Sequence, residues 1–158
     1  MNFIVVISMA LLILIDQMTK VWAVNTLANG MDIRIWEGVF HLHYISNYGA
    51  AWGMLSGKQT FLIMFTSIII IGMIYYMTKL PHNKEGFWTK VALVMIMSGA
   101  IGNLIDRVTL GYVRDFLYFI LIDFPIFNIA DILVVVGVGV LMLAMFLGDA
   151  EGNKEVQK

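Results

Sequence analysis

The sequence contains no cysteine and few charged residues. The absence of cysteine excludes disulfide bonds, thiolate metal sites and a cysteine nucleophile. Asp, Glu, Lys and Arg make up only 13% of the 158 residues, the net charge at pH 7 is −1, and no block of basic residues is present. We therefore expect no nucleic-acid partner, because binding of that kind depends on concentrated Lys and Arg.

Apolar residues make up 60% of the chain, and the mean hydropathy is +0.85. Soluble domains are only about half apolar. Four apolar runs approach the roughly 20 residues that a helix needs to cross a bilayer, and they do not alternate polar with apolar residues as barrel strands do. We predict an all-α integral membrane protein, with one domain over residues 1–148 and four spans at about 3–23, 60–79, 87–106 and 130–148.

The connections between the spans differ in composition. The segment IRIWEGVFHLHYI is rich in β-branched and aromatic residues, so we expect a small β-rich element within residues 30–58. The connection after the second span contains Lys79, Lys84 and Lys90, which places it and both termini in the cytoplasm by the positive-inside rule, although the other connections also carry basic residues. Residues 149–158 then form a polar cytoplasmic tail without regular structure.

Polar side chains gather where three of the predicted spans reach the outer side. Asp16 and Lys20 are four residues apart, so they share one face of a helix. Ionisable residues at membrane depth are candidates for function. The whole set comprises Asp16, Lys20, Asn103, Asp106, Arg107, Asp115, Asn128 and Asp131.

Several of these residues also have a purely structural interpretation. Asp16 and Lys20 could form a simple ion pair at a helix end. Asn128 suits the N-cap position, with Asp131 at the third helical position, where the helix dipole favours a negative charge. Asp115 could be a solvated loop charge or another cap. These interpretations and a shared functional site both remain open at the level of single residues.

Other catalytic chemistries find less support in the sequence. There is no GxSxG nucleophile elbow. His41 and His43 lack a third ligand, so we predict no metal site and no cofactor. Gly99 and Gly102 are best explained by close helix packing. Paired carboxylates are the chemistry that the sequence offers most readily.

Asp115 and Asp131 could work as such a pair if they face each other in a poorly hydrated pocket. Two like charges at close range in a low dielectric repel strongly, so one carboxyl group keeps a proton. The ionised group can take a proton from water while the protonated group polarises a carbonyl, as in the dyad of an aspartic protease. This chemistry needs neither a metal nor a covalent intermediate.

Five short segments follow one another along the chain: DQMTK at 16–20, NYGAAWG at 47–53, GAIGNLIDR at 99–107, VRDF at 113–116 and FPIFNIAD at 124–131. Together they resemble the lipoprotein signal peptidase family, also called signal peptidase II. The resemblance spans most of the chain and implies a bacterial inner-membrane aspartic endopeptidase with its active site near the outer face. Such an enzyme removes the signal peptide of a prolipoprotein just before a diacylglyceryl-modified cysteine, and globomycin inhibits it.

The resemblance also implies roles for individual residues, and the expected partners are the prolipoprotein and membrane lipid. The catalytic residues are Asp115 and Asp131. The residues that position the substrate are Asn47, Asn103, Arg107 and Asn128. The residues that support the site are Asp16, Lys20, Gly99, Gly102, Asp106 and Ala130. Nothing in the sequence demands a partner subunit, so we expect a monomer.

Two residues depart from the family pattern. Arg114 stands where an apolar residue is usual, and Ile132 stands where a small hydroxyl residue is common. A cation beside Asp115 would favour its ionised form if the two side chains meet, which would make Asp115 the base and Asp131 the proton donor. The alternative functions are a small transporter or proton-relay subunit that uses the same carboxylates, and a non-catalytic scaffold.

Overall fold

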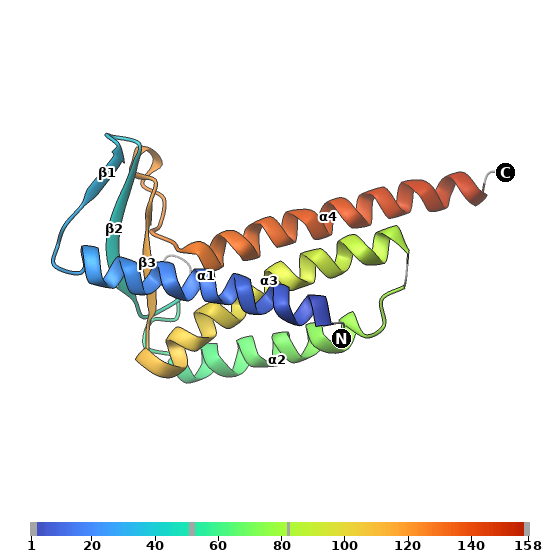
Figure 1. The fold of residues 1–158 in the computed structure, drawn as a ribbon, viewed down its shortest axis with the longest axis horizontal. Coiled ribbons are helices and arrows are strands. Elements are labelled where there is room, and N and C mark those ends of the chain that lie inside the picture. The colour runs from blue at the N-terminus through green and yellow to red at the C-terminus, as the bar shows by residue number, and fades with distance from the viewer. Residues whose placement is uncertain (1–2, 51–52, 82, 157–158) are drawn as a thin grey trace.

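The structure of the protein is a computed structural model that describes residues 3–50, 53–81 and 83–156. Four helices form a bundle, and a small sheet lies at one end of it (Figure 1). Both termini and the connection between the second and third helices lie at the opposite end. The helices are α1 (Phe3–Leu27), α2 (Gln59–Met77), α3 (Lys84–Leu110) and α4 (Ile129–Val156).

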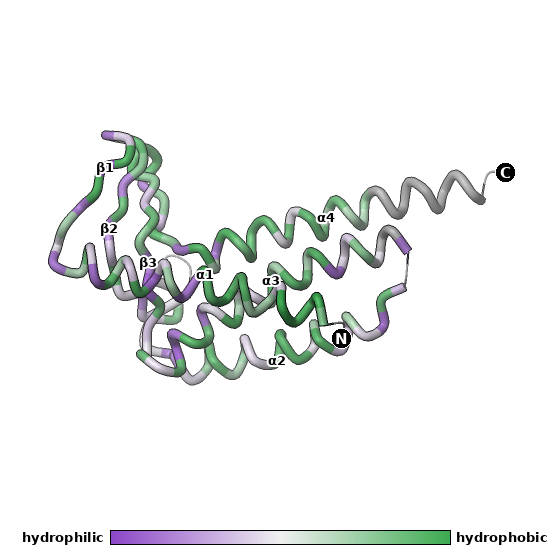
Figure 2. Tube along the Cα trace, in the orientation of Figure 1, coloured by the Kyte–Doolittle hydropathy of each residue, from purple (hydrophilic) through white to green (hydrophobic). Residues whose placement is uncertain are grey.

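All four helices are long and apolar enough to cross a membrane, which confirms the predicted fold class. Apolar residues run along the helices, while polar residues gather mainly at the sheet end and in the connections (Figure 2). The third helix is longer than the expected 87–106, because Asn83 caps its start by accepting a hydrogen bond from the Gly86 N–H at 2.8 Å. Gly111, with φ +80°, ends this helix in the left-handed conformation.

The last helix also extends beyond its expected end. A tail without regular structure was expected from residue 149, but the helical backbone continues through Val156. No proline, the residue that most strongly interrupts a helix, occurs in this part of the chain.

The sheet contains three antiparallel strands in the order β1-β2-β3. β1 (Ile33–Trp36) and β2 (Phe40–Asn47) lie within the predicted β-rich segment. β3 (Val113–Tyr118) comes from the connection between α3 and α4, where no strand was predicted. In its register with β2, Asp115 lies opposite Ile45, and Val113 lies opposite Asn47. The sheet therefore brings together two segments that are far apart in the sequence.

The third helix is the centre of the bundle. It contacts α1, α2 and α4, and 50% of its apolar span is buried, against 17–22% for the other three. The predicted close packing at Gly99 and Gly102 is present. A Cβ atom on Gly99 would collide with the Ala130 carbonyl oxygen, and one on Gly102 would collide with the Asp16 carboxylate. The absent side chains therefore let α4 and Asp16 approach the backbone of α3.

We expect Gly99→Ala to destabilise the protein by about 1–3 kcal/mol, because the added methyl group would force α3 and α4 apart. Gly72→Ala on α2 is the matched control, since a Cβ there meets nothing within 4 Å and alanine is the better helix former. Thermal unfolding in one detergent would compare the two variants with the wild type. Equal midpoints for the two variants would contradict the close packing at Gly99.

Candidate active site

A cavity of about 1090 Å³ lies between the sheet and the adjoining ends of α3 and α4. Both predicted catalytic residues, Asp115 on β3 and Asp131 on α4, line it. Three of the residues expected to position the substrate line it too, namely Asn47, Asn103 and Arg107. The fold thus brings residues from β2, β3, α3 and α4 to one place.

Each of the four carboxyl oxygens of the two aspartates accepts a hydrogen bond from an asparagine. Asp115 Oδ1 accepts from Asn128 Nδ2 at 2.6 Å, and Asp115 Oδ2 accepts from Asn47 Nδ2 at 2.9 Å. Asp131 Oδ1 accepts from Asn103 Nδ2 at 2.9 Å, and Asp131 Oδ2 accepts from the Asn128 backbone N–H at 3.0 Å. Both carboxyl groups are therefore held in fixed orientations.

The three asparagines are themselves oriented, because each amide oxygen accepts a hydrogen bond of its own. The oxygen of Asn47 accepts from the Gly49 N–H at 2.9 Å, and that of Asn128 accepts from the Asp131 N–H at 3.1 Å. The oxygen of Asn103 accepts from Lys20 Nζ at 2.8 Å and from Asn128 Nδ2 at 3.0 Å. With the oxygens engaged in this way, the NH₂ groups can only point toward the carboxylates.

Asn128 and Asp131 also cap the fourth helix, as the structural interpretation expected. Each side chain accepts a hydrogen bond from the backbone N–H of the other, at 3.0 and 3.1 Å. This is the reciprocal arrangement of a capping box. The structural and functional interpretations are therefore compatible, because the bonds that begin α4 also aim Asp131 toward the cavity.

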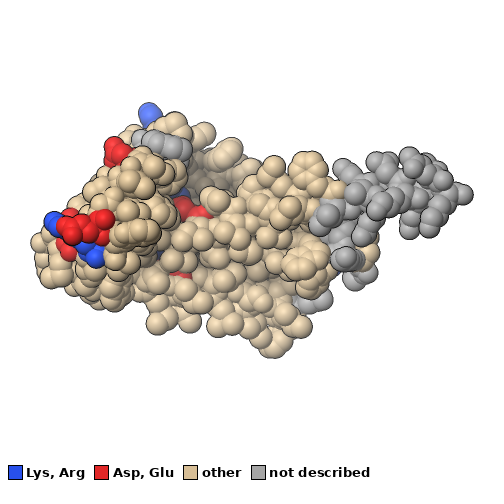
Figure 3. Space-filling view, turned by 90° about the horizontal axis from the view of Figure 1, so that it is seen from above, with Lys and Arg blue, Asp and Glu red and all other residues tan. Residues whose placement is uncertain are grey.

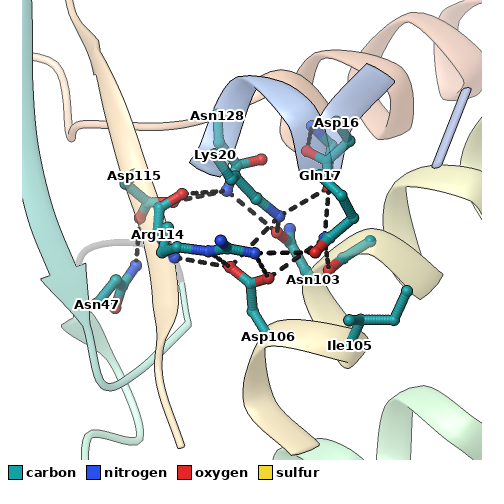
Figure 4. Close-up of polar contacts among 12 residues, drawn as sticks. Asp16, Gln17, Lys20, Asn47, Asn103, Ile105, Asp106, Arg114, Asp115 and Asn128 are labelled. Atoms are coloured by element: carbon teal, nitrogen blue, oxygen red, sulfur yellow. Dashed lines mark hydrogen bonds and ion pairs between the residues drawn. The ribbon is translucent and has the colours of Figure 1, made fainter. Parts of the chain in front are cut away.

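Behind the cavity lies a buried network of charged groups (Figure 4). Lys20 Nζ is 2.9 Å from Asp16 and 3.7 Å from Asp106, and all three side chains are inaccessible to solvent. The i,i+4 pair expected for Asp16 and Lys20 is thus present, but it lies in the interior rather than at an exposed helix end. Asp16 Oδ1 also accepts from the Ala130 N–H at 2.9 Å, which ties the start of α4 to α1.

Arg107 lines the cavity. Its Nη2 donates to the Gly49 carbonyl oxygen at 3.1 Å, while its Nε is buried and has no hydrogen-bond partner among the described residues. The Ala51 and Trp52 positions of the NYGAAWG segment lie outside the described residues. No group of three or more His, Asp or Glu residues in the described ranges could hold a metal ion.

The pKa of Asp115 is raised to about 7. Burial is the largest cause, since it penalises the charged carboxylate, and the nearby charge of Asp131 acts in the same direction. The hydrogen bonds from Asn47 and Asn128 oppose both effects. A carboxyl group of this kind can hold a proton near neutral pH, as acid–base catalysis requires.

Comparison with known proteins places these features in a family. A family model described as "Signal peptidase (SPase) II" matches residues 8–147. The lipoprotein signal peptidase of Clostridium novyi (strain NT) is 43% identical over 138 residues, which cover 85% of this chain and 90% of that protein. The chain belongs to the signal peptidase II family. Another member, the lipoprotein signal peptidase of Streptococcus pyogenes serotype M1, is 38% identical over 148 residues, covering 94% and 96% of the two chains.

Solved structures agree with this membership in a family of membrane proteases. One, described as a bacterial membrane enzyme structure by the in meso method at 2.3 Å resolution, has a TM-score of 0.81 and 33% identity, and the match covers 93% of this chain and 90% of that one. A second, at 1.9 Å resolution, has a TM-score of 0.78 and 35% identity, and the match covers 89% and 91%.

The first departure from the family pattern has a different consequence from the one expected. Arg114 does not meet Asp115, because successive side chains of a strand point to opposite faces. Its guanidinium group instead donates to Asp106, with Nη2 to Oδ1 at 2.7 Å and Nε to Oδ2 at 3.0 Å (Figure 4). Asp106 thereby raises the pKa of Arg114. The condition for making Asp115 the ionised base is thus not met.

One member of the buried network was missed in the sequence. Gln17 donates from Nε2 to Asp16, to Asp106 and to the Gly102 carbonyl oxygen at 3.0–3.2 Å, and its Oε1 accepts from Arg114. In the sequence, only its position between Asp16 and Lys20 in DQMTK could have indicated that Gln17 belongs to the network. Ile132, the second departure, adds an apolar wall to the cavity.

We expect the raised pKa of Asp115 to make stability depend on pH. Between about pH 4 and pH 7 the folded protein holds a proton on this carboxyl group that the unfolded chain releases, so the free energy of unfolding falls as the pH rises through this interval. Asp115→Asn lacks this contribution. Unfolding midpoints of the wild type should therefore fall relative to those of the variant from acid to neutral pH, and parallel curves would contradict the assignment.

Proposed function

We propose that the chain is an intramembrane aspartic endopeptidase that removes signal peptides from diacylglyceryl-modified prolipoproteins, cutting just before the lipidated cysteine. The observation that carries this proposal is the pair Asp115 and Asp131 in one cavity, with every carboxyl oxygen oriented by an asparagine. Membership in the signal peptidase II family supports the substrate class, since the curated relatives are named lipoprotein signal peptidases.

The two aspartates divide the acid and base roles. Asp115, with its pKa near 7, holds the shared proton. Asp131 is the base, because it lies in the first turn of α4, where the helix dipole and the Asn128 N–H stabilise a negative charge. Asp131 takes a proton from water as the water oxygen attacks the scissile carbonyl carbon, and Asp115 gives its proton to the carbonyl oxygen. The C–N bond then breaks as Asp131 passes its proton to the leaving nitrogen and Asp115 recovers its own.

The cavity suits a substrate that is apolar on both sides of one polar bond. Its apolar wall comes from α4 and from the segment before it, and includes Ile132, Val135, Val136 and residues 124–127. This wall accommodates the apolar signal peptide and the acyl chains of the lipidated cysteine. Arg107, Asn47 and Asn103, which line the cavity, hold the substrate backbone through its carbonyl oxygens.

The arrangement of the bundle supports a location near the outer face of the bacterial inner membrane. The site lies at the sheet end, and both termini lie at the other (Figure 1). With cytoplasmic termini, the site faces outward, where the lipid anchor would hold the scissile bond near the interface. The enzyme acts as a monomer, since one chain supplies both carboxylates, and globomycin inhibits it by occupying the same cavity.

A cleavage assay in detergent tests this function. The substrates are a prolipoprotein with a diacylated cysteine and its unlipidated form. We expect the wild type to cut only the lipidated form, and Asp115→Asn and Asp131→Asn to lose activity by about 100-fold or more while remaining folded, because each removes one half of the acid–base pair.

Asp32→Asn is the matched control for this assay. It makes the same chemical change at a half-exposed aspartate that pairs with His43 on the sheet, away from the cavity, and it should retain wild-type activity. Wild-type cleavage by either dyad variant would show that its aspartate is not catalytic. Failure of the wild type to cut either substrate would overturn the proposed function itself.

A further inference from the structure

The side chain of Arg114 connects the catalytic strand to two helices. It is 8% exposed, and it lies on the face of β3 opposite to that of its neighbour Asp115. Its backbone N–H, Nε and Nη2 all donate to the Asp106 carboxylate, at 2.7–3.0 Å, and Nη2 also donates to Gln17 Oε1 at 2.8 Å. One residue thus joins β3 to α3 and to α1 (Figure 4).

The geometry of this junction is specific. Two parallel N–H···O bonds between a guanidinium group and a carboxylate fix both planes, which a single ion pair does not do. The third bond, from the Arg114 backbone N–H, holds the strand itself at the residue before Asp115. Because the Asp106 side chain is fully buried, these bonds do not compete with bulk water.

The same part of α3 holds the other catalytic aspartate. Asn103, which donates to Asp131 at 2.9 Å, precedes Asp106 by three residues, so the two side chains lie on neighbouring positions of one helix face. The strand that carries Asp115 is therefore attached to α3 through the bonds between Arg114 and Asp106. Asp131 is attached to the same helix through its bond from Asn103. The separation of the two carboxyl groups depends on both connections.

We propose that Arg114 is a positioning residue for the peptidase reaction, which sets the distance between the two aspartates by fastening β3 to Asp106 on α3. This inference rests on the proposed function. An apolar residue at this position would keep the backbone hydrogen bond to Asp106 but lose the guanidinium bonds to Asp106 and Gln17. The buried Asp106 carboxylate also requires the guanidinium group as its partner. The other nearby cation, Lys20 Nζ, is 3.7 Å from Asp106, which is too far for a hydrogen bond.

The test compares Arg114→Met, Arg114→Lys and the double variant Arg114→Met with Asp106→Asn. The double variant removes both charges, so it separates the loss of the connection from the effect of an unpaired buried carboxylate. Arg34→Met is the matched control, because Arg34 makes an exposed i,i+3 pair with Glu37 on the sheet. Cleavage of the diacylated prolipoprotein gives kcat and KM, and thermal unfolding reports the folded fraction.

If Arg114 positions Asp115, Arg114→Met and the double variant lower kcat by about 10- to 100-fold with KM changed by less than about twofold, because small displacements of reacting groups act on the chemical step. Arg114→Lys recovers part of the loss, and Arg34→Met retains wild-type kcat. A folded Arg114→Met variant with wild-type kcat would overturn the inference, even if its unfolding midpoint were lowered. The proposed function would remain intact in that case, since the wild type cuts the substrate in the same assay. A double variant with wild-type kcat would also overturn it.

Discussion

A carboxylate surrounded by hydrocarbon is stable only when protein groups replace the water molecules that would hydrate it. This constraint determines how side chains are arranged at the sheet end of the bundle. Asp16 and Asp106 meet Lys20 and Arg114, so the buried network contains two negative and two positive groups. Asp115 and Asp131 instead accept hydrogen bonds from asparagines, and neither forms an ion pair within the described residues. Asp16 and Asp106 are thus held by cationic side chains, whereas Asp115 and Asp131 are held by amide groups.

The third helix gives both groups of carboxylates their positions. Its glycines allow α4 and the Asp16 side chain to come into direct contact with its backbone. One face then presents Asn103 to Asp131 and Asp106 to Arg114. On the face seen in Figure 3, charged side chains gather at the sheet end, and acidic atoms are also visible in a recess near the middle of the view. The polar interior is thus enclosed by an apolar exterior that suits lipid.

The sequence predicts the features that depend on local pattern. Runs of apolar residues indicated four spans, and the Asn128–Asp131 spacing indicated a helix cap that the structure contains. Strand β3 was missed because its pairing with β2 joins segments about 70 residues apart, which no local signal reports. The direction of the Arg114 side chain was missed for the same reason, since only the strand alternation turns it toward Asp106. The five family-like segments predicted a set of site residues where spacing alone left structural alternatives open.

In the proposed reaction two carboxyl groups activate water directly, so no covalent bond forms between enzyme and substrate. Cleavage of the diacylated prolipoprotein in the presence of hydroxylamine, followed by mass spectrometry, tests this claim most directly. We expect a released signal peptide that ends in a free carboxylate and an enzyme of unchanged mass at every time point. A signal peptide that ends in a hydroxamate, or an enzyme whose mass has increased by that of the peptide, would contradict it by revealing an acyl-enzyme intermediate.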